Sequence, residues 1–196
     1  HCFFPTSETF NLCMVTHAPF LLVDNRQQIK PREKVNELLV EELGKLAADT
    51  LCELRDLGQK DGTYLLNANI EKIVRWSDRS SYYYSWRDVD RSLIQSRAII
   101  EPCLEKIKNA ELLLSVDNKY LKGSQSYRVT PKSLASLLTT EQLKQLRKTS
   151  GEIGILCEKL NELDFYSIDN IIELKSYSTS DFAADITPEF MRTQPA

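Results

Sequence analysis

The densest group of polar side chains that could do chemistry is the run Asp24-Asn25-Arg26-Gln27-Gln28-Ile29-Lys30. It lies between the apolar run 20–23 and a long helical pattern that follows Pro31. A loop beside the start of a helix can present cations and amides to an anion. Arg26 is the best candidate for such a contact, because a guanidinium can bind two phosphate oxygens at once. The alternative is a solvated loop in which Arg26 pairs with Asp24.

The aromatic run Tyr82-Tyr83-Tyr84-Ser85-Trp86 is a second candidate. Aromatic rings can stack on bases while nearby cations follow phosphates, and this run is flanked by arginines. Interleaved aspartates neutralise much of that charge, so nucleic acid is not the expected partner. The composition also suits a protein-binding hot spot, with Tyr84 and Trp86 as the contact residues. The alternative is a set of half-buried aromatic side chains that pack a loop onto the helices.

A nucleophilic or metal site has little support. Cys13 and His17 are four residues apart in a β-like run, so they would share one strand face, as an activated thiol requires. A packed strand explains the same pair. The five cysteines are widely spaced and form no CxxC pair, and the chain has two histidines, so no metal is expected. Reduced thiols in a cytoplasmic protein are the expected state.

Composition places the chain among soluble globular proteins. Of its 196 residues, 42% are hydrophobic and 27% are charged, which is ordinary for that class. No apolar stretch approaches the roughly 20 residues that a membrane span requires, so no membrane partner is expected. The net charge of -3 does not favour binding to nucleic acid or to an anionic membrane.

A long helix from Pro31 to Leu57 is the clearest element that could position the Arg26 run. It would be about 40 Å long, with Gly58 as its C-cap. Three-and-four spacing predicts an apolar face that includes Val35, Leu38, Leu39, Leu43, Leu46, Ala47, Leu51, Leu54 and Leu57.

Short β-like runs precede this helix, at 2–4, 11–17 and 20–23. Further helices are expected at 64–76, 88–109, 131–138, 140–148 and 153–163, and short strands at 112–116 and 127–129. Near the end, Thr187 reads as an N-cap with Pro188 in the first helical position. Because both ends read as interrupted elements, we expect an internal piece of a larger protein.

The expected fold is therefore α+β and mostly helical. A small N-terminal β element packs on the long helix over residues 1–62. A largely α-helical region of unknown role follows over residues 63–196.

Residues 2–57 resemble the segment that follows the nucleotide-binding domain in sacsin-like ATPases. The resemblance is carried by Phe3-Phe4-Pro5-Thr6, by the run from Thr16 to Lys30, and by Asn36-Glu37-Leu38-Leu39. Residues 184–190 are similar to a stretch that recurs further downstream in these proteins. They belong to the GHKL superfamily, with the ninety-kilodalton heat-shock chaperone, histidine kinases and gyrase.

The resemblance implies that Arg26 reaches back to the γ-phosphate of ATP in an upstream ATPase domain, with Gln28 and Lys30 as helpers. The superfamily's nucleotide pocket needs an acid-x-x-x-Asn helix, an Asp-x-Gly-x-Gly turn and a glycine-rich lid. Glu105 and Asn109 have the first spacing, but no such turn follows them. ATP and Mg²⁺ therefore belong to the parent protein, and this chain alone is not expected to turn over ATP.

Two hypotheses of different class result. In the first, the chain relays nucleotide state from the upstream ATPase domain to a client protein or second subunit. In the second, it is a helical protein–protein interaction module with no link to nucleotide, which uses Tyr84 and Trp86.

Overall fold

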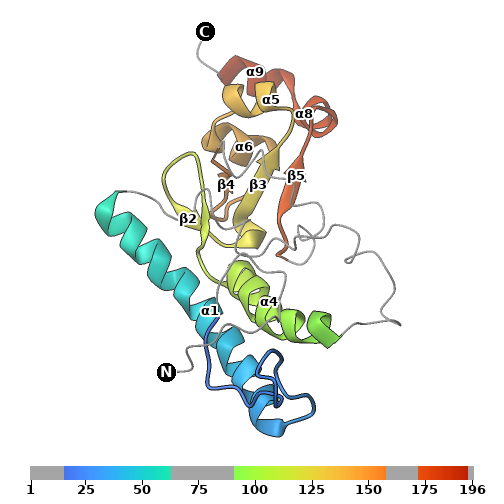
Figure 1. The fold of residues 1–196 in the computed structure, drawn as a ribbon. Coiled ribbons are helices and arrows are strands. Elements are labelled where there is room, and N and C mark those ends of the chain that lie inside the picture. Colours follow the sequence, from blue (N-terminus) through green and yellow to red (C-terminus); the bar gives the residue numbers. More distant parts are fainter. Residues whose placement is uncertain (1–15, 63–90, 158–171, 194–196) are drawn as a thin grey trace. The chain divides into compact units, whose positions relative to one another are not determined.

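The computed structural model describes residues 16–62, 91–157 and 172–193, and the fold is α+β and mostly helical, as predicted (Figure 1). The chain folds into two compact units, and in the described residues the boundary between them lies between Lys106 and Ile107. In the described residues, the first unit holds 16–62 and 91–106, and the second holds 107–157 and 172–193.

The described elements are short except for two helices in the first unit, α1 and α4. In chain order they are α1 Lys34–Asp61, α4 Arg91–Asn109, β1 Leu113–Leu114, β2 Tyr120–Leu121, the 3₁₀ helix η2 Gly123–Gln125, β3 Ser126–Val129, α5 Lys132–Leu137, α6 Thr140–Leu146, β4 Gly154–Ile155, β5 Lys175–Tyr177, α8 Thr179–Asp185 and α9 Pro188–Thr193.

The long helix α1 is confirmed, but both of its ends lie further along the chain than predicted. Pro31 lies in a turn, and α1 begins at Lys34 with Glu33 as its N-cap. Gly58 lies within the helix. Gly62 is the C-cap, because its φ of 67° lets its N–H donate to the carbonyls of Gln59 and Gly58.

The packed face of α1 also differs from the predicted one. The buried side chains include Asn36, Val40, Leu43, Ala48 and Leu51. The predicted apolar positions Val35, Leu38, Leu46 and Leu57 are exposed. The helix is apolar over a wide arc, and the packed side is the one that carries Gly44.

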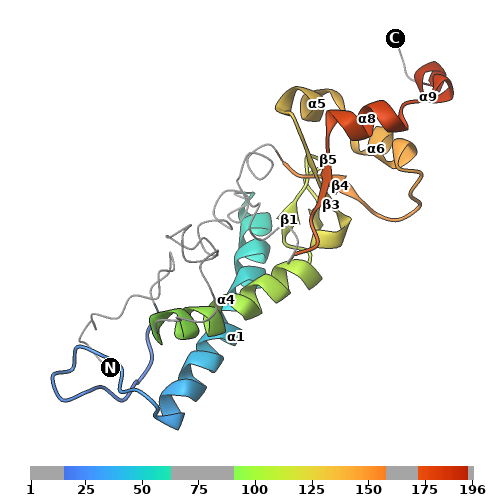
Figure 2. The ribbon, with the colours of Figure 1, turned by 90° about the vertical axis from the view of Figure 1, so that its right-hand side faces the viewer.

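Gly44 lies against α4, and Figure 2 shows α1 and α4 crossing each other. A Cβ at Gly44 would lie 2.4 Å from the carbonyl oxygen of Ala98 and 3.2 Å from the ring of Pro102. The absence of a side chain therefore allows the two backbones to approach closely. Lys106 of α4 also donates to Asp49 of α1 at 2.8 Å. Because α4 packs on α1, the unit boundary differs from the division at residue 62 that the sequence suggests.

The second unit is built on a three-stranded parallel sheet of order β4-β3-β5. Its apolar core includes Val129 of β3, Ile155 of β4 and Tyr177 of β5, with side chains from α5 and α6 packed on them. A separate hairpin pairs β1 with β2. The strands predicted near 112–116 and 127–129 are confirmed, as are the two helices after residue 131.

The predicted helix at 153–163 is wrong over its described part. Residues 153–156 are all buried, and Gly154–Ile155 form β4. A short buried apolar run suits a parallel strand as well as a helix, so its periodicity could not decide between them. Residues 158–163 and the predicted helix at 64–76 lie outside the described residues.

Two helix starts in the second unit are capped by a threonine hydroxyl. Thr139 caps α6, since its side chain accepts from the N–H of Gln142. Thr187 accepts from the N–H of Phe190 at 3.2 Å, and Pro188 opens α9, as predicted.

Candidate functional site

The polar run 24–30 forms a closed hairpin, which we call the Arg26 loop and define as residues 21–30. Leu22 and Ile29 form an antiparallel bridge. The N–H of Val23 donates to the carbonyl of Gln28 at 3.0 Å, and the N–H of Lys30 donates to the carbonyl of Leu21 at 2.8 Å. The loop is thus closed by its own backbone.

The amide side chain of Asn36, in the first turn of α1, fixes the Arg26 loop to that helix. Its Oδ1 accepts from the N–H of Leu21 at 2.8 Å. Its Nδ2 donates to the carbonyls of Leu21 at 2.9 Å and Lys30 at 2.8 Å. Asn36 is 4% exposed, so these bonds are shielded from water. One buried side chain therefore holds both ends of the loop.

Arg26 lies at the tip of this loop and is exposed. Its N–H donates to the carbonyl of Val23 at 2.7 Å, and its φ is 57°. Asn25 supports the same turn, because its Oδ1 accepts from the N–H of Gln27 at 3.0 Å. A positive φ is uncommon for a residue other than glycine, and such residues concentrate at functional sites.

The structure brings the predicted residues Arg26, Gln28 and Lys30 together on this one loop. Gln28 is exposed. Lys30 is also exposed, and its ammonium lies 2.9 Å from the carboxylate of Glu33. The hydrogen bond from Lys30 to Glu33, with the attraction between their charges, raises the pKa of Lys30. The loop thus carries two cations, Arg26 and Lys30, of which Lys30 is paired with Glu33. Cations of this kind can bind an anion through charge-assisted hydrogen bonds.

Tyr84, Trp86 and Cys13 lie outside the described residues. His17 is exposed ahead of the Arg26 loop. In the described parts of the chain, no group of three or more His, Cys, Asp or Glu side chains is arranged to hold a metal ion.

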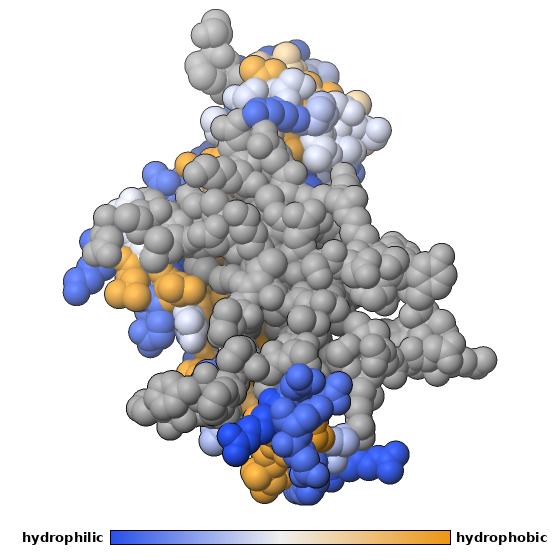
Figure 3. All heavy atoms as spheres, viewed as in Figure 1, coloured by the Kyte–Doolittle hydropathy of each residue, from blue (hydrophilic) through white to orange (hydrophobic). Residues whose placement is uncertain are grey.

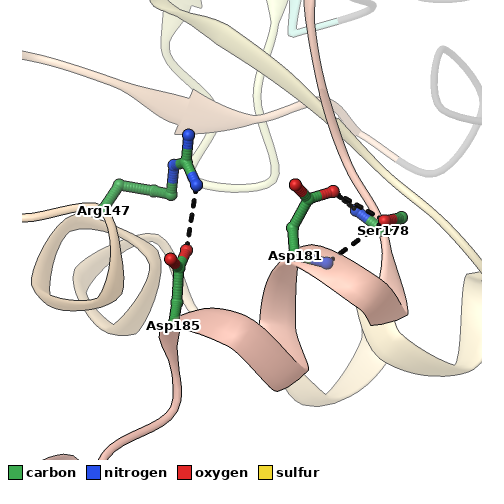
Figure 4. Close-up of polar contacts among 4 residues, drawn as sticks. All are labelled: Arg147, Ser178, Asp181 and Asp185. Carbon is green, nitrogen blue, oxygen red and sulfur yellow. Dashed lines mark hydrogen bonds and ion pairs between the residues drawn. The ribbon is translucent and has the colours of Figure 1, made fainter.

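A second polar group, which the sequence analysis missed, joins α6 to α8 in the second unit (Figure 4). Nη1 of Arg147 lies 3.0 Å from Oδ2 of Asp185. The same guanidinium lies 5.7 Å from the centre of the ring of Tyr177, which is fully buried. Burial is the main cause that raises the pKa of Tyr177, so its hydroxyl stays protonated.

Ser178 and Asp181 complete this group at the start of α8. Oγ of Ser178 donates to the carboxylate of Asp181 at 2.6 Å and accepts from the N–H of Asp181 at 3.3 Å. The hydroxyl and N–H of Ser178 lower the pKa of Asp181. These contacts form a capping box, and the ion pair ties two helix ends together. The arrangement is structural.

The sequence contains a recognisable motif for two residues of this group. Ser178 and Asp181 have the three-residue spacing of a capping box. Arg147 and Asp185 are 38 residues apart, and only the fold brings them together.

Comparison with protein-family models, curated proteins and solved structures found no match. Among the described residues, no helix combines the length and the apolar character that crossing a membrane requires.

Proposed function

We propose that this chain is an internal segment of a cytoplasmic, sacsin-like and heat-shock-90-like ATP-binding protein, in which it relays nucleotide state from an upstream ATPase domain. Arg26 contacts the γ-phosphate of ATP held by that domain, and Gln28 and Lys30 assist. ATP and Mg²⁺ are bound by the parent protein. A client protein or second subunit receives the signal.

The observation that supports this proposal is the anchoring of the Arg26 loop to α1. A guanidinium stabilises charge on a transferring phosphoryl group best when the backbone that carries it is fixed before the reaction. Asn36 contributes to this by holding both ends of the Arg26 loop. The free thiols of Cys52 and Cys103 are consistent with a reducing compartment.

The test is the ATPase rate of the parent protein carrying Arg26→Ala. We expect kcat to fall by about 100-fold or more, since removal of one preorganised donor to a charged transition state has an effect of that order. Arg32→Ala is the matched control, because Arg32 is also exposed and has a positive φ of 58° but lies outside the loop. Its rate should stay within about twofold of the wild type, as expected for a surface change away from the site.

Two results would overturn the proposal. One is an ATPase rate that Arg26→Ala leaves unchanged. The other is a parent reading frame that encodes no acid-and-Asn helix followed by Asp-x-Gly-x-Gly upstream of this chain.

A further inference from the structure

Asn36 is the one polar side chain that is buried among the described side chains of the first unit. It is the third residue of α1, which begins at Lys34. Asparagine is a weak helix former, and burying its amide costs free energy unless its polar atoms find partners. The helix alone therefore does not explain this residue, and the explanation lies in what the amide binds.

The hydrogen bonds of the Asn36 amide match the chemistry of asparagine. Its Oδ1 accepts from the N–H of Leu21, and its Nδ2 donates to the carbonyls of Leu21 and Lys30. A carboxylate of the same shape offers acceptors only, so aspartate cannot make the two donated bonds. Because the three bonds reach both ends of the Arg26 loop, they restrain its orientation on the helix as well as its position.

The tip of the Arg26 loop depends on this anchor because it lies in solvent. Residues 24–28 are exposed, and hydrophilic side chains gather over the loop at the lower end of the view in Figure 3. Ile29 is 5% exposed and is the buried side chain of the loop. Apolar burial is non-directional, so Ile29 holds the loop to the protein without fixing its angle. The directional restraint comes from Asn36.

We propose that Asn36 is a positioning residue for ATP turnover, which sets the orientation of the backbone that carries Arg26. This inference rests on the function proposed above, and it names the residue through which the Arg26 contact is controlled. Asn36 itself touches neither the phosphate nor Mg²⁺. Its effect on the reaction therefore passes through Arg26 and disappears when Arg26 is removed.

This dependence separates positioning from a purely structural role. If Asn36 only stabilised the fold, its loss would lower the rate by the same factor whether or not Arg26 is present. If Asn36 acts by orienting the loop, its loss has an effect only while the guanidinium is there. A double-mutant cycle measures the difference, because residues that act as a unit are non-additive.

The cycle compares the ATPase rates of the parent protein as wild type, Asn36→Ala, Arg26→Ala and the double variant. We expect Asn36→Ala to lower kcat by at least about 10-fold, since a displacement of about 1 Å in a catalytic group can cost about 100-fold. In the Arg26→Ala background, the same change should alter kcat by less than about twofold. KM for ATP should stay within about twofold of the wild type, because another domain of the parent holds the nucleotide.

Two further variants test the chemistry of the anchor. Asn36→Asp keeps the shape and one acceptor but loses both donors, so it should lower kcat by at least about 10-fold as well. It also replaces Asn36→Ala in the cycle if circular dichroism shows that the alanine variant does not fold. Thr50→Ala is the matched control, because it removes a side-chain hydrogen bond of α1, to the carbonyl of Leu46, that does not reach the loop. Its kcat should stay within about twofold of the wild type.

Equal factors for the Asn36 change in both backgrounds overturn this inference. So does a wild-type kcat in the Asn36 variants of a parent whose rate Arg26→Ala lowers. A rate that Arg26→Ala leaves unchanged is a different result, because it refutes the proposed function itself and this inference with it. The Arg26→Ala variant alone therefore tells the two failures apart.

Discussion

Replacing Asn36 with alanine should release the Arg26 loop from α1 while leaving the helix itself in place. Alanine is the best helix former, so the backbone of α1 gains if anything from the change. What is lost is a set of three hydrogen bonds, from the N–H of Leu21 and to the carbonyls of Leu21 and Lys30.

The size of the effect follows from these three contacts. A typical hydrogen bond in a protein contributes about 1 kcal/mol net, so the loop should lose about 3 kcal/mol of local stability. That free energy corresponds to an increase of about 100-fold in the opening equilibrium of the loop.

Hydrogen exchange of the loop amides measures this opening directly. The N–H groups of Val23, Arg26 and Lys30 are hydrogen bonded within the loop, so they report on it. Asn25→Ala is the matched control, because it removes a single, exposed side-chain hydrogen bond to the N–H of Gln27. We expect it to change exchange by about fivefold or less, the factor that corresponds to about 1 kcal/mol.

Equal exchange in Asn36→Ala and Asn25→Ala would refute the reasoning, because the loop would then be held by its own backbone contacts alone. Loss of protection throughout the first unit would also refute it, since the anchor is expected to act locally.

Two further predictions concern stability. Gly44→Ala should lower the free energy of unfolding, measured by urea titration, by about 2–3 kcal/mol, because the new Cβ would overlap the backbone of Ala98. Gly151→Ala is the control: the nearest atom to its Cβ is 3.9 Å away, so this change should be neutral in the same titration. Asp181→Asn should reduce the loss of folding stability at acid pH. The pKa of Asp181 is lowered in the folded state, so the carboxylate contributes stability above its unfolded pKa of about 3.9, and this contribution is lost as pH falls through the folded pKa. Urea midpoints of the variant and the wild type that run parallel below about pH 4 would contradict the role given to Asp181.

The features that the sequence predicted well are those that depend on near neighbours. The long helix has a strong period, and Thr187 and Pro188 form a helix start within two residues. Their partners are at most a few turns away, so local chemistry determines them.

The features that it missed depend on distant contacts. Hydrophobic spacing placed Val35, Leu38 and Leu46 on the packed face of α1, but Gly44 decides which face can approach α4. The buried run around Gly154 becomes a strand because β3 lies beside it. The contact between Arg147 and Asp185 exists only after the fold has brought the ends of α6 and α8 together. None of these facts can be read from a window of neighbouring residues.

The central position of β3 in the parallel sheet also has a consequence for synthesis on the ribosome. Tyr127 of β3 pairs with Lys175 of β5, which comes 48 positions later in the chain. At about 5–20 residues per second, β5 is made roughly 2–10 s after β3. During that interval the edge of β3 that will receive β5 presents open backbone donors and acceptors, which is the exposure that favours aggregation of nascent chains. The second unit is therefore completed late, and its nascent form is the stage at which a chaperone would act on this chain.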